Sequence, residues 1–108
     1  MLNQIILVGR LTKEVEVEKE EERKVAKINL AIPRSFKNAE GQYDTDFVEC
    51  IAFDSIGENT KEYCKKGDII GIKGRIQTRI VENNDEKQYK MEIIAEKVTF
   101  LSSKPKED

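Results

Sequence analysis

The segment FVECIAFDSIGENTKEYCKKGDIIGIKGRIQTRI, residues 47–80, decides the fold class because its hydrophobic period changes twice. Residues 47–53 alternate between larger and smaller side chains, as a strand with two largely apolar faces can. Residues 55–68 space their apolar side chains as a helix does, and Ser55 and Glu58 have the spacing of a capping box. After this helix the period of two returns. The segment therefore predicts a strand, one short helix and a second strand.

Strand patterns extend this arrangement in both directions. Period-two alternation predicts five strands, over residues 3–11, 24–32, 45–53, 68–81 and 88–101. Val15 and Val17 continue the first strand as a half-exposed ribbon, and Pro33 is expected to end the second and begin a long loop.

Five strands with one short helix between the third and the fourth is the order of an OB-fold barrel, an all-β architecture. We predict one such domain over residues 1–101, a turn over residues 82–87 and a short polar tail over residues 102–108.

Length and composition narrow the class of protein. A chain of 108 residues suits a single domain. It contains no histidine, which removes His-based catalysis and most zinc sites, and no other catalytic constellation or Gly-rich phosphate loop is present. We therefore expect no enzyme and no cofactor. Cys50 and Cys64 lack the spacing of a disulfide framework and indicate two buried free thiols. The apolar run 5–8 is too short for a membrane span, which indicates a cytoplasmic protein.

The net charge of −2 is unevenly distributed. Residues 14–22 hold six Glu and one Lys, which leaves 18 basic and 15 acidic residues in the rest of the chain. A local basic patch can bind a polyanion despite a negative total, so nucleic acid is not excluded as a partner.

One face of the predicted strand 68–81 carries long polar side chains at every second position, which we call the basic row: Lys73, Arg75, Gln77 and Arg79. The alternate positions are apolar or small. Such a row can neutralise phosphates and donate hydrogen bonds to them. The alternative interpretation is an ordinary solvated strand face.

Aromatic side chains provide a second signal for nucleic acid. Phe47 and Phe53 share one face of their strand, and small residues, which suit the inside of a tight barrel, share the other. The two Phe would then face outward, where an aromatic ring can stack on a base. The alternative is that both belong to the core. Phe36, next to the basic Arg34 in the predicted loop, is a further candidate.

With these motifs in place, the chain resembles the bacterial single-stranded DNA-binding protein family. The resemblance is carried by MLNQIILVGRLTKEVE (residues 1–16), by residues 47–80 with their G-R-I-Q-T-R motif, and by EIIAEKVTFL (residues 92–101). It implies an OB fold and a homo-oligomer, a dimer or tetramer. It also implies single-stranded DNA binding without sequence preference, in the replication, recombination and repair of nucleoid DNA.

The resemblance also implies site residues. The family's stacking aromatics correspond to Phe36, Phe47 and Phe53. Its basic contacts correspond to Arg10, Arg34, Lys73, Arg75 and Arg79, with Gln77 lying between them in the basic row.

Two departures from the family pattern limit what the resemblance implies. The aromatic that commonly follows T-R is replaced by Ile80 and Val81. The residues up to Asp108 do not include the family's long tail with an acidic tip. The resemblance therefore does not imply that this sequence recruits replication proteins through such a tail. Two alternatives remain open, a primosome-type OB module that binds proteins and an RNA-binding OB domain.

Overall fold

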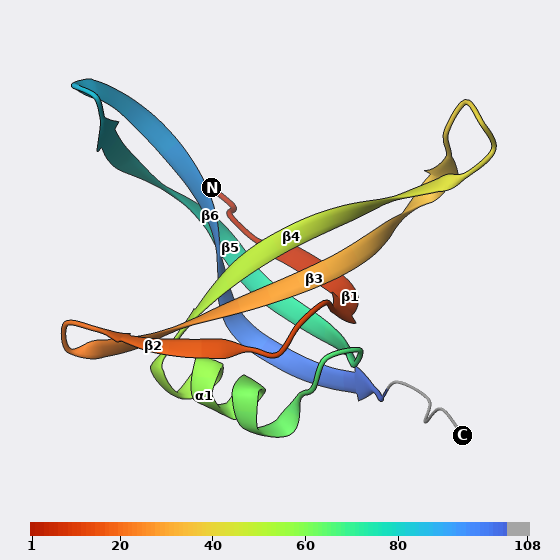
Figure 1. The fold of residues 1–108 in the computed structure, drawn as a ribbon, viewed down its shortest axis with the longest axis horizontal. Helices are drawn as coiled ribbons and strands as arrows, with labels where there is room; N and C mark the ends of the chain where they lie inside the picture. The colour runs from red at the N-terminus through yellow and green to blue at the C-terminus, as the bar shows by residue number, and fades with distance from the viewer. Residues whose placement is uncertain (104–108) are drawn as a thin grey trace.

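The structure, a computed structural model, describes residues 1–103, so most of the predicted polar tail lies outside the described residues (Figure 1). Its elements are β1 (Ile5–Leu11), β2 (Glu16–Glu20), β3 (Arg23–Lys37), β4 (Tyr43–Phe53), α1 (Asp54–Tyr63), β5 (Ile69–Asn83) and β6 (Glu86–Ser102).

The sheet closes on itself. Its strand order is β1-β5-β6-β4-β3-β2, and β1 also pairs with β3, which completes the ring. The five predicted strands are all present, the first of them divided into β1 and β2, and the helix lies between β4 and β5 (Figure 1). The predicted OB-type barrel is confirmed.

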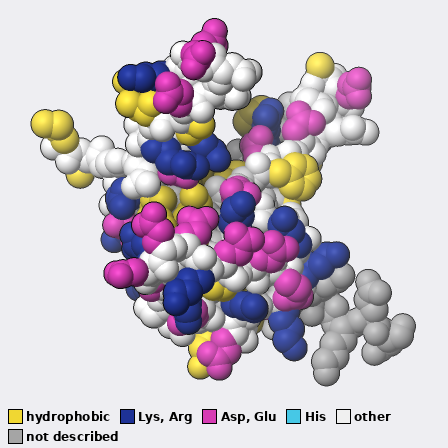
Figure 2. Space-filling model, turned by 60° about the vertical axis from the view of Figure 1, so that its left-hand side comes forward, with side chains coloured by type: hydrophobic (Ala, Val, Ile, Leu, Met, Phe, Trp, Pro, Cys, Tyr) yellow, Lys and Arg dark blue, Asp and Glu magenta, His cyan; other side chains and the backbone are white. Residues whose placement is uncertain are grey.

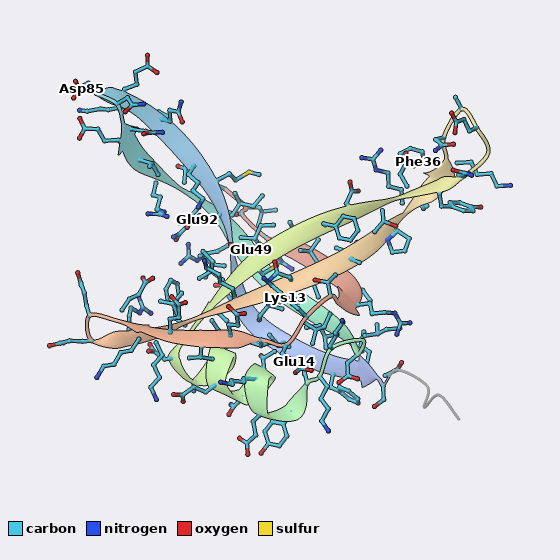
Figure 3. The ribbon with its side chains drawn as sticks, in the orientation of Figure 1. Lys13, Glu14, Phe36, Glu49, Asp85 and Glu92 are labelled. Atoms are coloured by element: carbon cyan, nitrogen blue, oxygen red, sulfur yellow. The ribbon has the colours of Figure 1, made fainter. Side chains whose placement is uncertain are left out.

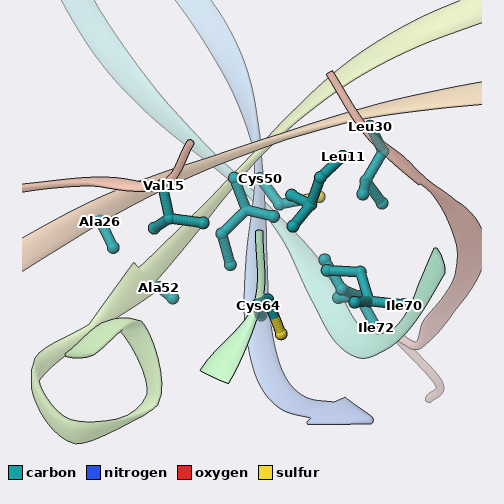
Figure 4. Packing of buried hydrophobic residues seen from close by; sticks show 11 residues of the cluster. Leu11, Val15, Ala26, Leu30, Cys50, Ala52, Cys64, Ile70 and Ile72 are labelled. Atoms are coloured by element: carbon teal, nitrogen blue, oxygen red, sulfur yellow. The ribbon is translucent and has the colours of Figure 1, made fainter. Parts of the chain in front are cut away.

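The barrel interior is filled by the inward side chains of the strands and by Cys64 after the helix (Figure 4): Leu11, Val15, Ala26, Ile28, Leu30, Cys50, Ala52, Cys64, Ile70, Ile72 and Ala95. Both cysteines are free and buried, as predicted. Burial raises the pKa of the Cys50 thiol to about 11. Gly74 lies where β5 approaches β6 so closely that a Cβ would collide with the Ile94 carbonyl oxygen.

Two long hairpins extend from this barrel (Figure 1). The β3–β4 arm, residues 32–46, lies beyond the last pairing of β3 with β1. The β5–β6 arm, residues 75–94, lies beyond the last pairing of β5 with β1. The two arms diverge from the barrel (Figure 1). Side chains of β4 and of β5 line a common groove near the base of the β5–β6 arm.

The expectation that Pro33 ends its strand is wrong. β3 continues to Lys37, and the loop is reduced to residues 38–42. The register between β3 and β4 shifts between Pro33 and Lys37, and a proline fits such an irregularity because its missing N–H costs no regular ladder bond there. Arg34 and Phe36 therefore lie on a strand and not in a loop.

The predicted turn over residues 82–87 is too long. β5 and β6 pair out to Asn83 and Glu86, and only two residues connect them. Asn84 and Asp85 have φ of 51° and 65°, the left-handed conformations that a tight two-residue hairpin turn requires and that Asn and Asp tolerate.

The predicted capping box is also wrong. Phe53 occupies the N-cap position with no side-chain cap hydrogen bond, and Ser55 lies inside the helix. The helix ends at Tyr63, earlier than expected, and Gly67 takes a φ of 94° in the turn that leads to β5. No helix within residues 1–103 is long and apolar enough to cross a membrane.

Candidate nucleic-acid interface

The outward face of β4 carries the β4 outer row: Phe47, Glu49, Ile51 and Phe53. Phe47 is 76 % exposed, whereas Cys50 and Ala52 on the opposite face are fully buried. The predicted orientation of this strand is confirmed, because small side chains fill the narrow interior and the large ones must stand outside. Phe47 is therefore not part of the core, and Phe53 is partly exposed.

A groove of about 380 Å³ separates the β4 outer row from the β5–β6 arm, and we call it the outer groove. It brings together three of the predicted residues, Phe53 from β4 and Gln77 and Arg79 from β5. The full lining is Glu20, Val25, Lys27, Glu49, Ile51, Phe53, Gln77, Arg79, Lys90 and Glu92.

The basic row is fixed in place by hydrogen bonds along β5 and across to β6. Arg75 Nη1 donates to Gln77 Oε1 at 2.8 Å, and Gln77 Nε2 lies 3.5 Å from Glu92 Oε1. Arg79 Nε lies 3.1 Å from Glu92 Oε2, and the Glu92 side chain is only 8 % exposed. The positive charge of Arg79, whose side chain is more than half exposed, is thus partly offset by an almost buried carboxylate. Lys73, at the far end of the row, pairs in register with Ile6 of β1 and is exposed.

Phe53 has a cationic neighbour that the sequence did not reveal. The Arg23 guanidinium carbon lies 3.9 Å from the centroid of the Phe53 ring, a cation–π geometry, and Arg23 also pairs with Asp54 at 3.5 Å. The strand register explains the contact, because Val25 lies opposite Phe53 and Arg23 follows along the same face. The sequence analysis expected a long loop after residue 32, and a loop of that kind does not fix which residues of the two strands lie opposite each other.

The remaining predicted residues lie apart from the outer groove. Phe36 is 63 % exposed near the tip of the β3–β4 arm (Figure 3), with the Arg34 guanidinium 6.0 Å from its ring. Arg34 binds the Asp46 carboxylate through Nε at 3.1 Å and Nη2 at 3.0 Å. This hydrogen bond, with the attraction of the opposite charge, lowers the pKa of Asp46.

The Arg10 side chain forms a hydrogen bond within the protein. Its Nη1 donates to the Gly67 carbonyl oxygen at 2.6 Å and so ties β1 to the turn before β5. The register places Arg10 opposite Ala31 and Ala31 opposite Phe47, so all three face the same side of the sheet.

Lys27 and Lys90 line the outer groove and were missed by the sequence analysis. Lys27 lies opposite Ile51, and Lys90 lies opposite Arg79. Recognition of Asn84 and Asp85 as a two-residue turn would have found Lys90, because counting back from this turn pairs it with Arg79.

The face of the molecule seen in Figure 2 carries charges of both signs. Figure 2 shows Lys and Arg side chains interspersed with Asp and Glu and with exposed apolar side chains. Within the outer groove three basic side chains face three acidic ones, Glu20, Glu49 and Glu92. Residues 1–103 hold no group of three or more side chains suited to binding a metal ion.

A closed OB-type barrel with exposed aromatic rings beside basic side chains defines the class of single-strand-binding domains. The profile of the Single-strand binding protein family matches residues 2–101, and the chain belongs to this family.

Individual relatives agree. Single-stranded DNA-binding protein B of Bacillus subtilis is 44 % identical over 109 residues, which cover 99 % of this chain and 96 % of the relative. Single-stranded DNA-binding protein 3 of Listeria innocua is 44 % identical over 106 residues, which cover 96 % of this chain and 66 % of the relative. The crystal structure of a deletion mutant of the single-stranded DNA binding protein from Thermus aquaticus superposes with a TM-score of 0.78 at 25 % identity. It covers 94 % of this chain, which spans about half (51 %) of that longer chain.

Proposed function

We propose that the protein is a non-enzymatic binder of single-stranded DNA that acts without a defined recognition sequence in DNA replication, recombination and repair. The observation that carries this proposal is the outer groove, where Phe53 of the β4 outer row faces Gln77 and Arg79 of the basic row. Family membership and the names of the relatives support the same ligand.

The two rows supply different parts of the binding free energy. Phe47 and Phe53 lie on one strand face and offer rings on which bases stack, and stacking does not depend on the base because every base has a π-face. The basic row projects side chains at intervals of about 7 Å along β5, a spacing suited to the phosphates of an extended strand. Phosphate contacts position the strand and carry no sequence information.

The decisive experiment removes the rings singly. Phe47→Ala and Phe53→Ala should each weaken binding of a labelled oligo-dT by about 1–3 kcal/mol, measured by fluorescence anisotropy. Tyr63→Ala is the matched control, because Tyr63 is an aromatic on α1 that is 70 % exposed and does not line the outer groove. Circular dichroism must show that all three variants are folded. Folded Phe variants that bind like the wild type would refute this path for the DNA. An equal-length RNA competitor should compete poorly if DNA is the ligand.

We also propose a homo-oligomer, with β1 as the edge that meets a second copy. From Ile5 to Gly9, β1 pairs only with β5 among the described strands, so its other edge has no strand partner there. Three exposed apolar side chains lie on β1 and on β6, the next strand but one in the sheet: Ile6, Val8 and Leu101, which are 69 %, 51 % and 49 % exposed. Val8→Lys should reduce the mass measured by light scattering, and a wild type that is already monomeric would refute the proposal. We assign the protein to the nucleoid in the cytoplasm.

A further inference from the structure

The middle of the β4 outer row is occupied by a carboxylate. Glu49 stands between Phe47 and Ile51 on the outward face of β4, is exposed, and lines the outer groove with Phe53. Figure 3 shows Glu49 and Glu92 near the centre of the molecule, where the two arms diverge, whereas Phe36 and Asp85 lie toward the arm tips. Phe47 lies two residues from Glu49 on the same strand face, about 7 Å along the strand, so a base stacked on Phe47 lies beside the Glu49 side chain.

Glu49 differs from Glu92, the buried carboxylate of the outer groove, in having its acceptor sites open. Within residues 1–103 its carboxylate forms neither a hydrogen bond nor an ion pair, whereas Glu92 binds Arg79 at 3.1 Å. An unpaired anion repels phosphates, so Glu49 does not contribute to backbone binding. It can attract the ligand only by accepting hydrogen bonds, and along a DNA strand the groups that donate hydrogen bonds belong to the bases.

An unpaired donor lies next to this unpaired acceptor. Asn29 of β3 is directly opposite Glu49 in the strand register, and its Nδ2 is buried without a hydrogen-bond partner. Opposed residues of an antiparallel pair have Cβ atoms about 5 Å apart. A buried amide donor without a partner costs free energy. Because this Nδ2 has no exposed surface, a ligand cannot reach it, and Glu49 is the acceptor that the strand register places opposite it.

An exposed carboxylate acceptor on this strand face distinguishes among bases. Cytosine and adenine each present an exocyclic amino group beside a ring-nitrogen acceptor, and guanine presents an amino group and a ring N–H on the same edge. Thymine has no amino group, and its single N–H lies between two carbonyl oxygens whose lone pairs would face the carboxylate. A carboxylate accepts from an amino group, as Glu and Asp do with cytosine N4.

We propose that Glu49, positioned beside Asn29, gives the protein a preference for bases with an exocyclic amino group, and among pyrimidines for cytosine over thymine. The inference rests on the proposed single-stranded DNA binding and adds a composition bias to it. It does not create a recognition sequence, because stacking and phosphate contacts remain open to every base.

The test compares oligo-dC and oligo-dT of equal length by fluorescence anisotropy, at a pH above neutrality where cytosine is not protonated. The measured quantity is the ratio of the dT and dC dissociation constants. Glu49→Gln should lower this ratio about fivefold or more, because the Gln amide can also donate to the thymine carbonyls. Glu62→Gln is the control, since it removes the same charge from the exposed surface of α1, outside the outer groove.

The outcomes are distinct. A lower ratio in Glu49→Gln with an unchanged ratio in Glu62→Gln supports the inference. An equal gain in affinity for both oligonucleotides would show that Glu49 acts only as a charge and would overturn it, and so would unaltered binding. If the wild type binds neither oligonucleotide, the proposed function itself fails.

Discussion

Replacing Glu92 by Gln should strengthen DNA binding. Glu92 is not itself a predicted DNA contact, but it binds Arg79 and lies beside Gln77, two residues of the basic row. In the wild type the Arg79 guanidinium lies 3.1 Å from the Glu92 carboxylate, which is almost buried and so holds its partner strongly. Gln preserves the size of the side chain and can still accept from Gln77, but it removes the negative charge. Arg79 is then free to neutralise a phosphate.

The magnitude follows from counterion release. One more phosphate neutralised per protomer steepens the slope of log affinity against log salt by about 0.7 for a single strand. The advantage of Glu92→Gln over the wild type should therefore grow about fivefold for each tenfold fall in salt. The assay is an anisotropy titration of oligo-dT at several salt concentrations, with thermal unfolding recorded for each variant.

A second variant separates two causes of the gain. Adding Arg79→Gln to Glu92→Gln should abolish the steeper slope, because no freed cation remains. A gain that survives in the double variant would mean that Glu92 merely repels the DNA, and a slope that does not change in Glu92→Gln would mean that Arg79 does not face the strand. Either result refutes the reasoning about the basic row.

Three further predictions concern stability and the thiols. Gly74→Ala should destabilise the protein by about 1–3 kcal/mol in urea unfolding, since its Cβ would collide with a β6 carbonyl oxygen, whereas Gly71→Ala meets nothing closer than 3.6 Å and should cost less. Cys50, with a pKa raised to about 11 and no exposed surface, should resist a thiol reagent at neutral pH until the protein is unfolded in guanidinium; rapid labelling of the native protein would contradict this. Arg34 lowers the pKa of Asp46, so that pair stabilises the fold above the ordinary carboxyl pKa of about 4 and the contribution is lost as the pH falls through the lowered value. Asp46→Asn should therefore lose less melting temperature on acidification than the wild type, and an equal loss would argue against the pair.

The fold could be predicted because its signals are local and periodic. Alternation along β4 separated the two faces of the strand, and the interpretation that the smaller residues enter the barrel is confirmed, since Cys50 is buried and Phe47 is exposed. The change to a helical period between the third and fourth predicted strands then indicated the OB barrel. Both features depend only on neighbours along the chain.

The errors arose where pairing across strands outweighs a local signal. Pro33 does not end β3, because the register irregularity removes the need for its N–H. Ser55 does not cap α1, because the chain enters the helix directly from β4 through Phe53. Composition shows neither the register irregularity nor the path of the chain into α1.

The candidate site was predicted in part for the same reason. Phe53, Gln77 and Arg79 were found because each belongs to a row on a single strand. Arg23 and Lys90 reach the site from other strands, and the partner of Arg79 is Glu92, which lies across a hairpin whose turn length was misjudged. A residue's role in a groove between hairpins depends on the register of both.

The negative net charge and a polyanionic ligand are compatible because the outer groove itself is balanced. Its three basic side chains face three carboxylates, so the net attraction for phosphates within it is small and few counterions are released on binding. On the proposed path for the DNA, stacking on Phe47 and Phe53 would then supply a larger share of the binding free energy than in a domain with an unopposed basic face. The same balance would give Glu49 the influence proposed above, because a groove that attracts phosphates only weakly allows contacts with the bases to decide which single strands are held longest.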